Sequence, residues 1–189
     1  MRHTPIVTAL IAVLALAACG PSGEERAAAL AAFEDVEKVF QHPRCRNCHI
    51  EGDAPLQLDA GLPHAMEVVR GAEGMGAPGL RCYACHGEKN LPASYGPQAP
   101  PGAPHWALPT EDQKMAWFGL SSRQLCEAIQ DRERNGGRDL AALVKHVTED
   151  ELVLWGWDPG GEREPVQVPH DRFVASFTVW ADAGGPCPD

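Results

Sequence analysis

The chain has 189 residues, seven of them cysteines, and its 26 Asp and Glu residues outnumber its 16 Lys and Arg residues to give a net charge of −10. This length is typical of a single globular domain. The acidic balance argues against nucleic acid as a partner, because phosphate binding requires a basic surface. It favours redox or other protein partners that dock through a basic patch.

The N-terminus has the pattern of a bacterial export signal. Arg2 supplies a positive charge, and residues 6–16 are almost wholly apolar but too few to span a bilayer. Leu16-Ala17-Ala18-Cys19 resembles a lipobox, in which the cysteine is lipidated and becomes the first residue of the mature protein. The alternative is an ordinary cleaved signal that happens to contain a cysteine.

These features predict a signal peptide over residues 1–18, lipidation at Cys19 and a lipid-anchored tether over residues 19–26. A multiply acylated terminus is a stable membrane anchor. We therefore expect a lipoprotein on the periplasmic side of a bacterial membrane, and Gly20 favours the outer membrane. Residues 27–189 are expected to form one domain.

Apolar residues at helical spacing predict a first helix over residues 27–41, which Pro43 ends. Two motifs then follow along the chain, Cys45-Arg46-Asn47-Cys48-His49 and Cys82-Tyr83-Ala84-Cys85-His86. Both are C-x-x-C-H, the sequence of covalent c-type haem attachment. The two thiols add to the porphyrin vinyl groups and the histidine binds the iron. The sequence therefore predicts two covalently bound haem c groups, with His49 and His86 as proximal ligands.

Two other readings of these cysteines are weaker. Zinc ribbons separate their cysteine pairs by roughly 15–20 residues, whereas 33 residues lie between Cys48 and Cys82. A thioredoxin-like dithiol needs one pair near a βαβ pattern, which the sequence does not show. Neither a zinc ribbon nor a thioredoxin-like dithiol would need a histidine directly after each of the two cysteine pairs.

The middle of the chain predicts irregular structure. Glycine and proline indicate loops over residues 51–63 and 71–79, with a short helix over 64–70 between them. Residues 91–109 contain six prolines and are expected to wrap the surface near a haem edge.

The last eighty residues or so predict helices. Capping boxes begin at Thr110, Ser121 and Thr148, Asn135-Gly136-Gly137 ends one helix, and apolar residues predict others around 140–147 and 173–180. The predicted fold class is mainly α with extensive irregular loops, arranged compactly around two haems.

Two cysteines, Cys126 and Cys187, are left after lipidation and haem attachment. An oxidising compartment favours a disulfide between them. Two separate free thiols are the alternative.

The distal ligands are expected to be histidines. No methionine follows Met115, so a late distal methionine like that of small one-haem cytochromes is absent. His64 and His146 rank first, and we pair His64 with the first haem and His146 with the second. Met75, Met115 and His105 rank lower, His42 is too close to its own motif, and His170 is expected to be solvated.

The N-terminal half resembles exported bacterial di-haem cytochromes c. Segments of the second half, among them Leu152-Val153-Leu154-Trp155-Gly156-Trp157 and Gly185-Pro186-Cys187-Pro188, resemble a group often labelled isoquinoline oxidoreductase subunit. This resemblance implies a c-type electron-transfer component of an oxidoreductase, with no molybdopterin or iron–sulfur signature.

Motifs and resemblance together predict a membrane-anchored di-haem cytochrome that carries single electrons between redox partners and is not itself an enzyme. The alternative is a peroxidase-like enzyme with one open haem site, although bacterial di-haem peroxidases are about twice this size by resemblance. A haem-based gas sensor ranks last, because the chain has no separate signalling domain.

Overall fold

The computed structural model describes residues 20–189. The predicted signal peptide and the lipidation site Cys19 therefore lie outside the described residues. Six α-helices and two short hairpins make up the regular structure of this part of the chain. The mainly α fold class with long irregular segments is confirmed.

Helix α1 spans Gly23–Phe40 and begins four residues earlier than predicted. Its start is a capping box: the Ser22 hydroxyl accepts from the Glu25 N–H, and the Glu25 carboxylate accepts from the Ser22 N–H. The expected tether over residues 19–26 is thus wrong in its second half, which is helical. The motif Ser22-Gly23-Glu24-Glu25 was the sequence signal for this boundary.

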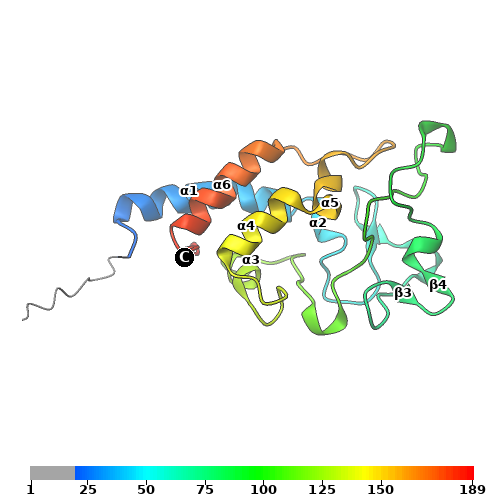
Figure 1. Ribbon diagram of the computed structural model, residues 1–189, viewed down its shortest axis with the longest axis horizontal. Helices are drawn as coiled ribbons and strands as arrows, with labels where there is room; N and C mark the ends of the chain where they lie inside the picture. The colour runs from blue at the N-terminus through cyan, green and yellow to red at the C-terminus, as the bar shows by residue number, and fades with distance from the viewer. Residues whose placement is uncertain (1–19) are drawn as a thin grey trace, which may run out of the picture.

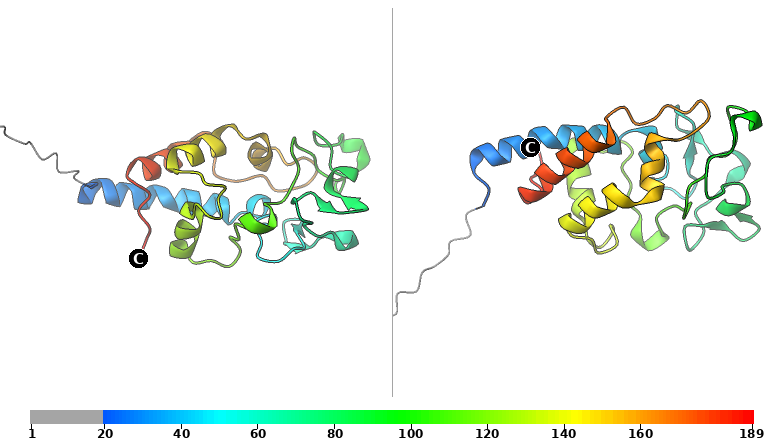
Figure 2. Two further views of the ribbon diagram at one scale, coloured as in Figure 1. Left: turned by 60° about the horizontal axis from the view of Figure 1, so that its bottom comes forward. Right: turned by 45° about the horizontal axis from the view of Figure 1, so that its top comes forward.

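Helix α6, His170–Asp182, lies beside α1, as both views in Figure 2 and Figure 1 show. Helices α3, Ser122–Gln130, and α4, Leu140–Glu149, complete this helical end. Aromatic rings form much of its core; Phe33 packs on Trp180 with centroids 5.3 Å apart, and Phe40 packs on Trp117 at 4.3 Å. A disulfide between Cys126 and Cys187 joins α3 to the C-terminal segment, as the sequence predicted.

The middle of the chain is built from short elements. Helix α2 spans Pro43–Arg46, β1 (Leu56–Gln57) pairs antiparallel with β2 (Leu62–Pro63), and β3 (Gly76–Ala77) pairs with β4 (Leu80–Arg81). The 3₁₀ turns are η1 (Ala65–Glu67), η2 (Cys82–Ala84), η3 (Ala93–Tyr95), η4 (Glu111–Gln113) and η5 (Trp155–Trp157). Gly76 has a φ of +86°, and a Cβ there would approach the Leu80 carbonyl to 2.5 Å, so the second hairpin requires glycine.

Three predicted elements differ in the structure. The expected helix over residues 64–70 is only the turn η1, because Met66 adopts a left-handed φ of 64°. Thr110 makes no cap hydrogen bond and precedes only the turn η4. Helix α5, Glu151–Leu154, is capped by Asp150 instead of Thr148, because the Asp150 carboxylate accepts from the N–H groups of Leu152 and Val153.

The molecule is elongated, with its helices and its loops at opposite ends. In Figure 1 the start of α1 and the C-terminus lie at the helical end, while the β3–β4 hairpin lies at the other end. Within residues 20–189, no helix is both long enough and apolar enough to cross a membrane.

Candidate functional site

The first C-x-x-C-H motif begins on helix α2. Nδ1 of His42 accepts a hydrogen bond from the Arg44 N–H and caps this helix. Because this ring nitrogen is occupied in the cap, we do not assign His42 as an iron ligand. The N–H groups of Cys48 and His49 then both reach the Cys45 carbonyl at 3.2 Å. Cys48 lines the cavity described below, whereas Cys45 packs against the helical core and His49 is stacked on Trp117, and neither of these two lines the cavity.

The second motif has the same closure in a different setting. It begins on the turn η2, directly after strand β4, and the N–H groups of Cys85 and His86 reach the Cys82 carbonyl at 3.2 and 2.9 Å. The local backbone bonds of the two motifs therefore match, although one begins on an α-helix and the other on a 3₁₀ turn.

The histidines of both motifs are held in the same way. Nδ1 of His49 lies 3.0 Å from the Met115 carbonyl, and Nδ1 of His86 lies 2.7 Å from the Pro101 carbonyl. A carbonyl only accepts, so Nδ1 carries the proton and Nε2 keeps the lone pair that a metal needs. Each ring is also stacked on a tryptophan, His49 on Trp117 at 3.4 Å and His86 on Trp106 at 4.4 Å between centroids.

Burial keeps these groups neutral. It lowers the pKa of His49 to about 3, and it also lowers the pKa of His86. Burial raises the pKa of the Cys45 thiol to about 12 and that of Cys48 to about 11. Reactive dithiols have a low thiol pKa, so the first motif lacks the electrostatics of a redox-active cysteine pair.

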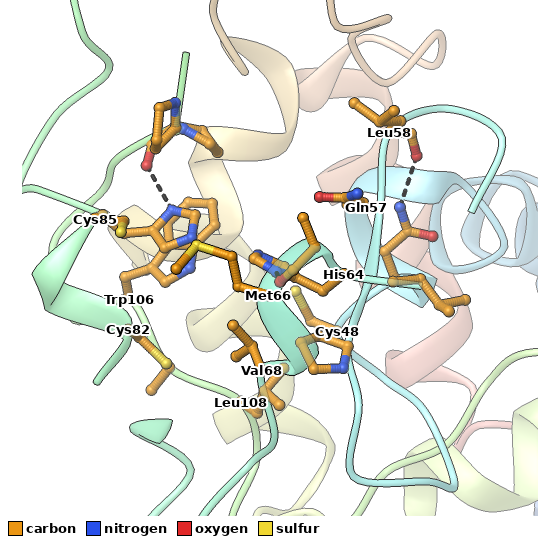
Figure 3. Close-up of a pocket in the computed structure, with 18 of the residues that line it drawn as sticks. Cys48, Gln57, Leu58, His64, Met66, Val68, Cys82, Cys85, Trp106 and Leu108 are labelled. Atoms are coloured by element: carbon orange, nitrogen blue, oxygen red, sulfur yellow. Dashed lines mark hydrogen bonds between the residues drawn. The ribbon is translucent and has the colours of Figure 1, made fainter. Parts of the chain in front are cut away.

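One cavity of about 380 Å³ lies between the two motifs (Figure 3). Cys48 of the first motif and Cys82, Cys85 and His86 of the second all line it. Its remaining walls are largely apolar and include Val68, Leu80, Leu108, Trp106 and Trp155. The segment 91–109 covers one side, because Gln98, Pro100 and Pro101 belong to the lining, and its expected place near a haem edge stays a prediction.

The charged residues of this lining are all basic, although the whole chain is acidic. They are Arg44, Arg81 and Arg163, with no Asp or Glu among the lining residues. Burial lowers the pKa of Arg44 and of Arg163, and the charge of Arg44 adds to the lowering at Arg163, so these two cations lie close together. The Arg44 guanidinium pairs with the exposed carboxylate of Asp59.

Two buried polar atoms beside the cavity have no hydrogen-bond partner, Nε of Arg44 and Oδ1 of Asn47. Such atoms are costly unless something pairs with them. Apolar walls, adjacent guanidinium groups and the thiols of Cys82 and Cys85 fit a flat, largely apolar group that carries carboxylates. The residues present therefore fit haem, whose propionates are its carboxylates.

The structure brings His64 to the second motif and not to the first. The ring centroids of His64 and His86 are 6.1 Å apart, and both side chains line the cavity. Two imidazoles that bind one metal ion from opposite sides, with metal–nitrogen bonds of about 2.0–2.1 Å, have centroids roughly 6.3 Å apart. Nδ1 of His64 lies 2.8 Å from the Ala65 carbonyl, so its Nε2 is also the free nitrogen.

In the described part of the chain, the only electrostatic link of His146 to a C-x-x-C-H motif is to the first one. This histidine stands in the last turn of α4 and is near enough for its charge to lower the pKa of His49. Nδ1 of His146 lies 3.4 Å from the Asp150 carboxylate, which again leaves Nε2 for a metal. His64 therefore lies beside the second motif instead of the first, and with that position taken we pair His146 with the first motif.

The lower-ranked candidates lie elsewhere. Met115 uses its carbonyl on the proximal ring of His49, and Met75 and His105 are exposed and outside the cavity lining. His170 is half-buried and its Nε2 donates to the Val147 carbonyl at 2.9 Å, so the expectation that it is solvated is wrong. Met66 lines the cavity and was missed, because a methionine two residues from a histidine carries no pattern.

Among residues 20–189, no three His, Cys, Asp or Glu side chains converge into a cluster that could hold a metal ion alone. The chain matches no protein-family model, no curated protein and no solved structure.

Proposed function

We propose that the protein is a di-haem c-type cytochrome that carries single electrons between redox partners. One observation carries the proposal: His49, His64, His86 and His146 each engage Nδ1 with an oxygen acceptor, and each keeps Nε2 as the free nitrogen. Two of them belong to C-x-x-C-H motifs and the other two lie near those motifs. His42 and His170 use their ring nitrogens differently.

The haem irons would supply one-electron exchange, and the protein would control it through ligands, burial and charge. Cys45, Cys48, Cys82 and Cys85 would form the thioether bonds. The Met115 and Pro101 carbonyls hold the proximal rings in the ligating tautomer. The apolar walls exclude water, and the guanidinium groups of Arg44 and Arg163 would balance propionate charge.

The shared cavity supports electron transfer in particular. Cys48 lines the same cavity as Cys82, Cys85 and His86, so groups attached at the two motifs would lie near one another. Such proximity favours passage of an electron from one haem to the other. Two histidines for each iron would leave neither position open, which favours a carrier over the peroxidase-like alternative.

The architecture suits a membrane tether. A lipid on Cys19 would join helix α1 at the helical end, whereas the hairpin β3–β4 and the second motif lie toward the opposite end (Figure 1). An anchored molecule would thus present its second haem away from the lipid. Its acidic charge suits a partner with a basic patch.

An optical redox titration of the exported protein, with carbon monoxide added to the fully reduced form, tests the proposed function. We expect two one-electron transitions, low-spin spectra at both haems and no change on addition of the gas. A haem that binds carbon monoxide in the wild-type protein would overturn the carrier and favour the enzyme. A protein without haem would overturn both.

A further inference from the structure

The segment that carries His64 also carries a second possible iron ligand. Met66 follows two residues later, and its side chain lines the same cavity. In Figure 3 the Met66 side chain extends from beside His64 toward Cys85 and Trp106. Trp106 is the ring on which His86 is stacked, so Met66 reaches toward the side of the cavity that holds the proximal ligand.

The backbone of this segment is strained. Met66 and Glu67 have φ values of 64° and 54°, a left-handed conformation that side chains other than glycine seldom adopt. Two such residues in succession persist where the surroundings hold them, and they are concentrated at ligand sites. A helix would separate the side chains of His64 and Met66 by about 200°, whereas in this turn both side chains line one cavity.

The exposure of Met66 is unusual for its position. Its relative exposure is 70%, although it lines an apolar cavity. A flat apolar group in this cavity would cover the thioether. Within residues 20–189 the other methionines, Met75 and Met115, are not in the lining, so Met66 is the one thioether of this part of the chain that faces the second motif.

We propose that Met66 is a reserve ligand for the iron of the second haem, and that its Sδ would bind this iron when the His64 imidazole is withdrawn. This inference rests on the proposed function, because it requires a haem at Cys82 and Cys85. The thioether donates a lone pair to the iron and no electron or proton leaves the protein. A methionine ligand raises the potential relative to a second histidine, so the choice between the two side chains sets the potential of this haem.

The test uses the exported holoprotein with His64→Ala, alone and combined with Met66→Ala. In His64→Ala we expect a low-spin second haem, an absorption band near the red end of the visible spectrum that marks sulfur–iron bonding, and a more positive midpoint potential. In the double variant we expect the band to be lost and one of the two haems to become high-spin and to bind carbon monoxide.

The matched control is His64→Ala combined with Met75→Ala, which removes an exposed methionine outside the cavity and should keep the band. If His64→Ala does not accumulate, His64→Gln carries the same test. A single His64 variant that is high-spin and binds the gas would overturn the role of Met66. Covalent haem content separates this failure from that of the proposed function: two haems per chain with no sulfur band refute only the reserve ligand, whereas fewer than two in the wild type refutes the proposed function itself.

Discussion

His49 and His86 carry the same chemistry in different surroundings. Both donate through Nδ1 to a backbone carbonyl, but burial lowers the pKa of His49 to about 3, and His86 lines an open cavity. Greater burial disfavours the more highly charged oxidised iron. On the proposed function, the haem at His49 would therefore have the higher potential if the ligand sets are equal.

His146→Ala tests the ligand assigned to the first haem. Because no other free imidazole is assigned to this iron, we expect one of the two haems to become high-spin when oxidised and to bind carbon monoxide when reduced. Lys145→Ala, at an exposed neighbour on the same helix, is the control and should keep the wild-type absorption spectrum. An unchanged low-spin spectrum in the His146 variant would remove it from the ligand set.

Arg163→Gln tests the positive charge at the cavity. A cation close to a haem disfavours oxidation, so its loss should lower the midpoint potential of the second haem, by on the order of 50 mV. Arg134→Gln, which removes an exposed cation outside the cavity lining, should leave both potentials unchanged in the same spectroelectrochemical titration. Equal shifts in the two variants would assign the effect to net charge alone.

At the scale of elements, α1 and α6 are joined by a partly buried ion pair. The Asp35 carboxylate of α1 accepts from Nε of Arg172 at 2.7 Å and from Nη2 at 3.0 Å, and it also accepts from the Ser176 hydroxyl at 3.3 Å. Hydrogen bonds to Arg172 hold the pKa of Asp35 below its usual range. The two long helices therefore depend on the charged form of this side chain.

Asp35→Asn should lower the free energy of unfolding at pH 7 by about 2 kcal/mol, the value typical of charged hydrogen bonds. A lowered carboxyl pKa stabilises the folded protein above the ordinary Asp pKa, and this stabilisation is lost as pH falls through the folded value. The difference in the free energy of unfolding between wild type and variant, measured by urea denaturation, should therefore become smaller below about pH 4. Glu34→Gln, an exposed neighbour on α1, is the control. A free-energy difference that stays constant down to pH 3 would show that the charged form of Asp35 is not what stabilises the fold.

The Cys126–Cys187 disulfide closes a separation of 61 residues and joins α3 to the C-terminal segment. Replacing both cysteines with alanine should lower the free energy of unfolding by roughly 4 kcal/mol, as the chain-entropy model gives for a loop of this length. The haem spectra should not change, because neither cysteine lines the cavity. Two titratable thiols in the denatured, unreduced wild type would contradict the bond.

Elements with local signals could be predicted from the sequence, and elements set by tertiary contacts could not. Helix α3 follows the Ser121 capping box, and α4 follows its apolar spacing. No α-helix follows the capping pattern at Thr110, because such a pattern makes a cap possible but does not by itself form a helix. The hairpins of two-residue strands are too short for any alternation to be visible, and the turn at Met66 depends on a strained backbone.

The candidate site divides in the same way. The two C-x-x-C-H motifs could be recognised from residue type and spacing, whereas the choice of His64 and His146 as distal ligands stays a prediction. The position of His64 beside His86 could not be predicted, because it depends on the irregular segment between the two motifs. The arginines of the cavity and Met66 were missed because they converge from distant parts of the chain or share no motif.

At the scale of the whole molecule, the helical end provides stability and the loop-rich end forms the site. The aromatic core lies among α1, α3, α4 and α6, whereas the cavity is walled by short turns and the proline-rich segment. Loops of this kind gain rigidity from what they bind, since they have few regular hydrogen bonds of their own. On the proposed function, covalent haem would complete a second core at this end of the molecule.

Intact-protein mass spectrometry of the exported chain, with Cys82→Ser combined with Cys85→Ser as the matched variant, tests the central claim most directly. We expect a wild-type mass equal to the processed polypeptide with its lipid on Cys19 plus two haems, and a variant mass with one haem fewer. A wild-type mass without haem, or an equal haem content in wild type and variant, would contradict it.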